Sequence, residues 1–239
     1  MKIQIIPCLK DNYSYLIIDK ENNIACVVDP SEALPIIKYL ENTKIKLKFI
    51  LNTHHHYDHV GGNQILKEKY GASVVGYKGD KDRIPGIDIL VSDQENWTYK
   101  KFEAKIIHIP GHTLGHICFY FYKDQSAFTG DTLFSLGCGR IFEGTYKQMF
   151  DSLMKLKKLP KNTKIFCGHE YTLQNSKFCM VHDKFNENLK NRINEIKIKL
   201  KAGLSTIPTT IKDELECNVF LRSGNVETFS KLRDLKDNF

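Results

Sequence analysis

One short segment of the sequence concentrates side chains that can bind metal ions. It contains His54, His56, Asp58 and His59, and it follows the apolar run at residues 49–51, which we expect to be a buried strand. Imidazole nitrogens combined with carboxylate oxygens suit zinc, iron or manganese. A surface loop could carry one His-x-His pair by chance, but not four such ligands within six positions. The segment therefore predicts a metal site.

Three further candidate ligands each come directly after a glycine that closes an apolar, strand-like run: His112, Asp131 and His169. Glycine permits the sharp turn and close backbone approach that bring the next side chain into a crowded site. The ends of neighbouring strands in a sandwich lie at one rim, where functional loops gather. We therefore expect these three turns to converge on the histidine-rich segment.

These seven ligands are too many for one tetrahedral zinc ion, but they fit two ions that share one ligand. We expect Asp58, His59 and His169 on one ion, Asp131 as the bridge, and three histidines on the other ion: His54, His56 and His112. A water between two such ions becomes acidic, its pKa falling to about 7 in the zinc precedent. Asp58 is the expected catalytic residue, which binds one ion and orients the resulting hydroxide.

The other histidines have structural interpretations. His55 lies between two ligands and should point to the opposite side. His108 falls within a predicted strand and His182 within a predicted helix, and for His116 we expect a hydrogen-bonded structural role. Asp29, which ends the apolar run at residues 24–28, could orient a ligand histidine through its second ring nitrogen.

The pattern of apolar residues predicts an α+β fold with two domains. Residues 1–169 mix short strands with helices, whereas residues 170–239 are helical. The expected strands are at residues 2–6, 15–18, 24–28, 49–51, 73–75, 87–91, 105–109, 117–122, 126–128 and 164–167. The expected helices begin near residues 31, 63, 146, 174, 185, 210 and 226.

Composition restricts the partners. The chain has 239 residues and a formal net charge of +7, but its basic residues are scattered, which argues against nucleic acid. Seven widely spaced cysteines without a C-x-x-C motif indicate reduced thiols, so we expect a cytoplasmic location. The first residues do not resemble a signal peptide, and no apolar stretch approaches the roughly 20 residues of a membrane span. We expect a monomer that acts on a small molecule.

Four motifs together resemble the metallo-β-lactamase superfamily and, within it, the glyoxalase II (hydroxyacylglutathione hydrolase) family. They are Thr-His-His-His-Tyr-Asp-His at residues 53–59, Pro-Gly-His-Thr at 110–113, Thr-Gly-Asp-Thr-Leu-Phe at 129–134 and Gly-His-Glu-Tyr-Thr at 168–172. The resemblance implies a four-layer αββα sandwich with a binuclear site, followed by a smaller C-terminal helical domain that helps to hold glutathione. We expect two divalent metal ions per chain, with zinc ahead of iron and manganese. The implied reaction converts S-D-lactoylglutathione to glutathione and D-lactate, the second step of methylglyoxal detoxification.

The resemblance also implies four substrate-binding residues. Arg140 ends a Gly-Cys-Gly-Arg stretch that is similar to one in the family, and Tyr171 matches its substrate-binding tyrosine. Arg233 and Lys236 match the basic pair that meets the glycine carboxylate of glutathione; without the resemblance, a solvated helix face would be the simpler interpretation.

Two positions depart from the family pattern. Phe142 stands where a tyrosine often supplies a hydroxyl group, so one substrate hydrogen bond is in doubt. Val219 replaces the proline of an Asn-Pro-Phe-Leu-Arg motif, which loosens a turn without touching the chemistry.

Three alternatives to the thioesterase remain open. The first is another hydrolase of the same fold, acting on a lactone, a β-lactam or a phosphodiester. The second is a persulfide dioxygenase with one iron, against which the second set of ligands argues. The third is a non-catalytic metal-binding or glutathione-binding protein, although closed structural zinc sites favour cysteine-rich tetrahedra.

Overall fold

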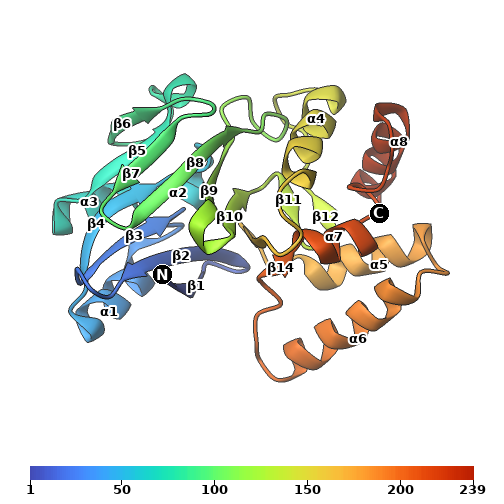
Figure 1. Cartoon of the computed structure of the whole chain (residues 1–239), viewed down its shortest axis with the longest axis horizontal. Helices are drawn as coiled ribbons and strands as arrows, with labels where there is room; N and C mark the ends of the chain where they lie inside the picture. The colour runs from blue at the N-terminus through green and yellow to red at the C-terminus, as the bar shows by residue number, and fades with distance from the viewer. The chain divides into compact units, whose positions relative to one another are not determined.

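The structure is a computed structural model that describes residues 1–239. The chain forms two compact units, which are considered one at a time. The first unit comprises residues 1–108 and 115–124, and the second comprises residues 109–114 and 125–239. Figure 1 labels most of the helices and strands of both units.

The first unit is built on a six-stranded sheet with the order β1-β2-β3-β4-β5-β6. Neighbours are antiparallel from β1 to β3 and parallel from β3 to β6. A second group of strands, β7, β8 and β9, pairs antiparallel. The elements are β1 (Lys2–Cys8), β2 (Asn12–Asp19), β3 (Ile24–Val28), α1 (Ala33–Thr43), β4 (Lys46–Leu51), α2 (Tyr57–Val60), α3 (Asn63–Tyr70), β5 (Ser73–Tyr77), η1 (Lys78–Asp80), β6 (Ile87–Val91), β7 (Asn96–Tyr99), β8 (Phe102–His108), β9 (Ile117–Phe121) and η2 (Tyr122–Asp124).

Helices α1 and α3 cover one face of the six-stranded sheet. Parallel strands need crossover connections, and these helices supply them between β3 and β4 and between β4 and β5. Their apolar stripes, which include Ile36, Leu40 and Leu66, pack with Leu16 and Val27 of the sheet in one buried cluster. Burial of each such side chain contributes about 1.5–3 kcal/mol. This core holds the carboxyl ends of β3 and β4 in place.

The second unit combines a few strands with five helices. Strands β10 and β13 are parallel, β14 pairs antiparallel with β13, and β11 and β12 form a small hairpin. The elements are β10 (Ser126–Gly130), β11 (Leu133–Phe134), β12 (Gly137–Cys138), α4 (Tyr146–Lys157), β13 (Lys164–Cys167), α5 (Thr172–His182), α6 (Glu187–Lys201), β14 (Thr209–Thr210), α7 (Ile211–Cys217) and α8 (Val226–Asp237). No helix of the chain combines the length and the apolar character needed to cross a membrane.

The elements follow the sequence predictions closely, with a few differences at their ends. Helix α4 begins at Tyr146, as predicted, because Thr145 and Gln148 form a capping box. It ends at Lys157, shortly before Pro160, which disfavours helical geometry in the residue before it. The sequence analysis missed β7 and the β11–β12 hairpin, because strands of two to four residues carry too few side chains for a periodic pattern.

A buried glutamate joins the helices of the second unit to the β11–β12 hairpin. Glu214 of α7 accepts hydrogen bonds from the Thr209 hydroxyl (2.7 Å), the Asn218 amide (2.8 Å) and the backbone N–H of Leu136 (2.8 Å). Leu136 has φ = 59°, a left-handed conformation that is costly for leucine, and the bond from its N–H helps to hold it there. Burial raises the pKa of Glu214 to about 7.

The raised pKa makes the stability of the protein depend on pH. An unfolded glutamate ionises near its ordinary value of 4.5, whereas the folded one keeps its proton until about pH 7. The contribution of Glu214 to the free energy of unfolding is therefore complete below pH 4.5. It decreases by up to about 3 kcal/mol as the pH rises to 7. Glu214→Gln mimics the protonated group. The free energy of unfolding of this variant, measured with urea, should therefore not decrease between pH 4.5 and 7 as that of wild type does. Parallel pH profiles of the two proteins would show that Glu214 does not titrate in this range.

Candidate metal centre and substrate arm

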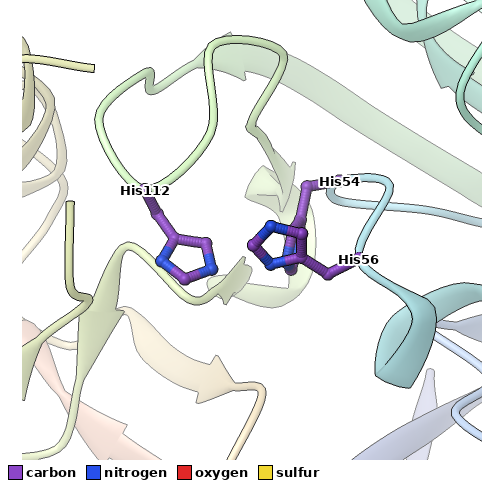
Figure 2. A group of neighbouring side chains, drawn as sticks. All are labelled: His54, His56 and His112. Carbon is purple, nitrogen blue, oxygen red and sulfur yellow. The ribbon is translucent and has the colours of Figure 1, made fainter. Parts of the chain in front are cut away.

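The first group of ligands follows β4 of the first unit. His54 and His56 lie between the end of this strand and α2, whose first turn carries Asp58 and His59. The imidazole ring of His54 lies 4.7 Å from that of His56 and 4.2 Å from that of His59, measured between centroids. Figure 2 shows the side chains of His54 and His56, and His112 on a separate loop. The four predicted ligands of this segment are thus brought together.

Asp29, at the end of β3, fixes the orientation of these histidines. Its Oδ1 accepts the backbone N–H of Thr53 (2.8 Å), and its Oδ2 accepts the Thr53 hydroxyl (2.6 Å) and lies 3.0 Å from Nδ1 of His59. The Thr53 hydroxyl oxygen is also 3.0 Å from Nδ1 of His54. Because the hydroxyl donates its proton to Asp29, its oxygen accepts from His54. Both histidines therefore donate from Nδ1, which leaves Nε2 as the ligand atom.

The hydrogen bonds of Asp29 favour an orienting role over that of a metal ligand. One ligand atom each of Asp29, His54 and His59 lies within 4.8 Å of the others, so these three could in principle hold an ion. Both carboxylate oxygens of Asp29 are, however, engaged by Thr53 and His59, as described above. Asp29 also has φ = 46°, a left-handed conformation that aspartate tolerates better than most residues and that often marks functional sites. The sequence prediction that it orients a histidine agrees with this geometry.

Asp58 is held by a residue that the sequence analysis missed. The side-chain amide of Asn12 donates to Oδ2 of Asp58 (3.0 Å) and to its backbone carbonyl (3.0 Å). The same Oδ2 lies 3.7 Å from Nε2 of His59. Asn12 begins β2, far from Asp58 in sequence, and no local pattern marks it as functional.

The two other histidines of the first unit near this group have different partners. Nδ1 of His55 lies 3.2 Å from Oδ2 of buried Asp80, which also pairs with Arg83. His116 is completely buried and its ring stacks on that of His54 at 4.6 Å. His55 thus belongs to a separate ion-pair network, whereas His116 supports the face of a ligand ring.

The second group of ligands lies in the second unit, at the ends of two parallel strands. Asp131 follows β10 and His169 follows β13, and the N–H of Gly168 donates to the carbonyl of Gly130 (2.9 Å). Parallel neighbours bring their carboxyl ends to the same edge. As a result, Oδ2 of Asp131 lies 3.3 Å from Nε2 of His169 and 3.6 Å from Nε2 of His112. A carboxylate oxygen shared by two imidazole nitrogens is well placed for a bridging ligand.

Two glycines permit the position of His112. A Cβ atom on Gly111 would lie 2.7 Å from Cβ of Met149 in α4, so only glycine lets the loop approach this helix. A Cβ atom on Gly139 would lie 1.8 Å from the carbonyl oxygen of Asp131. Close packing there brings the carbonyl of Arg140 to 2.8 Å from Nδ1 of His112. His112 therefore donates from Nδ1 and, like His54 and His59, offers Nε2 as its ligand atom.

Aromatic side chains line the second group. Tyr171, predicted to contact substrate, stacks on His169 at 4.6 Å and is about one-third exposed. Phe134 contacts the Tyr171 ring edge-on at 5.4 Å. Phe142, which departs from the family pattern, lies 5.2 Å from the ring of His112 and is largely exposed. It offers an apolar surface where a hydroxyl group was expected.

The three basic residues that were predicted to bind substrate gather around the end of α8. We refer to Arg140, Arg233 and Lys236, together with Tyr171, as the substrate arm. Arg233 is 4% exposed; its Nη1 donates to the carbonyl of Cys138 (2.9 Å), and its Nε and Nη2 donate to Asp237. Lys236 lies over the rings of two phenylalanines, and burial followed by repulsion from Arg233 lowers its pKa. Arg140 donates from Nε to Oδ1 of Asp237 at 3.3 Å.

The donors in each unit suit divalent metal ions. They are imidazole nitrogens and carboxylate oxygens, the set that zinc, iron and manganese accept. The second ring nitrogens of His54, His59 and His112 have acceptors within the protein, an arrangement typical of metal-ligating histidines.

Asp29→Asn should weaken metal binding without removing a ligand. Asparagine cannot accept all three hydrogen bonds that Asp29 accepts, so His54 and His59 lose their fixed tautomer and orientation. We expect the affinity for Zn²⁺ to fall by about 10–100-fold in a chelator competition. His55→Asn, in the same segment but paired with Asp80, is the control and should keep normal affinity. Unchanged affinity of Asp29→Asn would show that Asp29 has no orienting role.

Comparison with known protein families matches both parts of the chain. The metallo-beta-lactamase superfamily matches residues 10–89 and 101–169, and the hydroxyacylglutathione hydrolase C-terminus matches residues 170–239. The chain is 74% identical to hydroxyacylglutathione hydrolase from Pelagibacter ubique (strain HTCC1062) over 239 residues, which cover 100% of both proteins. It is 44% identical to the protein of that name from Nostoc punctiforme over 257 aligned positions, again with 100% coverage of each.

Solved structures share the fold. The structure of ETHE1 from Myxococcus xanthus aligns with a TM-score of 0.76 at 23% identity, covering 98% of this chain and 90% of that one. The BLEG-1 B3 metallo-beta-lactamase aligns with a TM-score of 0.72 at 22% identity, covering 92% and 99%. These neighbours confirm the predicted metallo-β-lactamase fold with its C-terminal helical region. The sequence matches, which extend over the whole length, confirm the predicted family: the chain belongs to the hydroxyacylglutathione hydrolases of the metallo-β-lactamase superfamily.

Proposed function

We propose that this chain hydrolyses 2-hydroxyacylglutathione thioesters, S-D-lactoylglutathione giving glutathione and D-lactate, at a site for two divalent metal ions. The observation that carries the proposal is the set of fixed imidazoles in a member of this family: His54, His59 and His112 each use Nδ1 within the protein and offer Nε2. Metal-ligating histidines almost always donate their other ring N–H in this way, which fixes the tautomer and the orientation of the ring.

In this proposal the two groups of ligands form one binuclear centre. One ion is held by His54, His56 and His112, and the other by Asp58, His59 and His169. Asp131 would be the ligand shared by the two ions, which the short distances from its Oδ2 to His112 and His169 support. Zinc is the proposed metal, with iron and manganese compatible with the same donors.

The residues of the chain have distinct tasks in the reaction. The bound ions supply an acidified water molecule and a Lewis acid for the thioester carbonyl. Asp58, held by Asn12, orients the attacking water towards that carbonyl and accepts its hydrogen bond. The glutathione thiol has an ordinary pKa near 8.5, so the thiolate leaves without a general acid from the protein.

The substrate arm lies in the second unit. We propose that residues 1–169 form the catalytic domain and that residues 170–239 form the domain that binds glutathione, in line with the two family matches. Tyr171, Arg140, Arg233 and Lys236 are the proposed contacts, because one aromatic hydroxyl and three cations suit the tripeptide's anionic groups. A mild net positive charge would favour encounter with this anionic substrate.

The proposal extends to the state of the protein in the cell. All seven cysteines are free and buried, as expected in a reducing compartment, and we propose a cytoplasmic location. We also propose that the enzyme acts as a monomer, which gel filtration can check.

His54→Ala should abolish hydrolysis by removing a ligand. Wild type should contain about two metal ions per chain and hydrolyse S-D-lactoylglutathione in preference to a lactone, a β-lactam and a phosphodiester. The variant should bind less metal and lose at least about 10²–10³-fold in kcat. Full activity with normal metal content would exclude His54 as a ligand, and saturation of wild type at one ion would contradict the binuclear site.

Lys236→Ala tests the substrate arm. If Lys236 meets a carboxylate of glutathione, its removal should raise KM about tenfold while kcat stays nearly constant. Lys231→Ala is the matched control, since Lys231 lies on the same helix and pairs with exposed Glu227. An unchanged KM for Lys236→Ala would remove this residue from the binding site.

A further inference from the structure

The last residue of α8 is an aspartate, which is unexpected at that position. The carboxyl end of a helix carries partial negative charge, so an anion there is unfavourable by a few tenths of a kcal/mol to 1 kcal/mol. Asp237 nevertheless ends α8. It is also about one-third exposed, so solvent could hydrate it without any partner. The contacts of Asp237 explain why the helix ends in this way.

One oxygen of Asp237 accepts hydrogen bonds from two arginines that are far apart in the sequence. Its Oδ1 lies 3.1 Å from Nε and 2.8 Å from Nη2 of Arg233, and 3.3 Å from Nε of Arg140. Arg233 is almost completely buried, and a buried guanidinium needs a counter-charge. Arg140 is exposed on 56% of its side chain and would otherwise sample many rotamers. Asp237 thus neutralises the first arginine and restrains the second.

The same contacts hold the backbone on which Arg140 stands. Nη1 of Arg233 donates to the carbonyl of Cys138 at 2.9 Å, two residues before Arg140. The carbonyl of Arg140 in turn accepts from Nδ1 of His112 at 2.8 Å. Arg140 is therefore fixed at its backbone by a proposed metal ligand and at its side chain by Asp237.

We infer that Asp237 is a positioning residue for glutathione: it holds Arg140 and Arg233 in the geometry that receives the tripeptide, without contacting the substrate itself. The inference rests on the proposed function, because it assumes that these arginines bind glutathione. Pre-ordering a flexible arginine removes an entropic cost from substrate binding. The loss of Asp237 should therefore raise KM. The chemistry at the metal centre should be untouched.

The test is the kinetics of Asp237→Ala with two thioesters that share the reacting bond. One is S-D-lactoylglutathione. The other is the D-lactoyl thioester of N-acetylcysteamine, which lacks both carboxylates of glutathione. We expect KM for the glutathione thioester to rise about 5–10-fold with kcat within twofold of wild type. The value of kcat/KM for the N-acetylcysteamine thioester should stay constant. Asp237→Glu, which keeps the charge, should recover part of the lost affinity.

Asp234→Asn is the matched control, because Asp234 lies in the same helix turn and binds Tyr146 rather than an arginine. It should leave both substrates unaffected. An unchanged or lower KM for Asp237→Ala would overturn the inference, as would an equal loss with both thioesters, which indicates a general structural defect. Failure of the proposed function itself has a different result, since wild type would then not hydrolyse S-D-lactoylglutathione.

Discussion

The hydrogen bonds accepted by the buried carboxylate of Asp29 determine how the first group of ligands is presented. Asp29 is 2% exposed, and it accepts from the backbone and hydroxyl of Thr53 and from His59. In a buried site such bonds are strong and leaving any of them unmade is costly, so the arrangement is rigid. Through Thr53 the same carboxylate also orients His54. Two imidazoles are thereby held in one tautomer before any ion arrives.

In the second unit, a histidine ring is oriented by a backbone carbonyl instead of a carboxylate. The carbonyl of Arg140 fixes the ring of His112, and the close approach of Gly139 to the backbone of Asp131 keeps that carbonyl in place. The hairpin before Arg140 is held by Glu214 and Asn218, which bind the backbone of residues 136 and 137. Helices late in the chain therefore stabilise a loop that orients a proposed ligand.

Arg140 connects two parts of the proposed function. Its backbone contacts His112, and its side chain belongs to the cluster of charges at the end of α8. A cluster of two arginines, one lysine and one aspartate keeps a net positive charge for an anionic ligand, while the aspartate limits the repulsion among the cations. The proposed metal ligand and the proposed substrate contact thus share one short segment of backbone in the second unit.

The sequence by itself determined the ligand candidates, the strands that precede them and the family. These features are local: a strand has a two-residue period, a glycine marks a sharp turn, and His-x-His-x-Asp-His is contiguous. It also predicted that Asp29 orients a histidine, although it could not say which one.

Only the tertiary structure decided which side chains bind each other. It paired Asp29 with His59, Asn12 with Asp58, and Asp237 with both Arg140 and Arg233. It also buried Arg233, which sequence alone would have placed on a solvated helix face. The physical reason is that such contacts, apart from the Arg233–Asp237 pair four positions apart on one helix, join residues 30 to 97 positions apart. Local periodicity carries no information about them, because they arise only when packed elements bring distant side chains together.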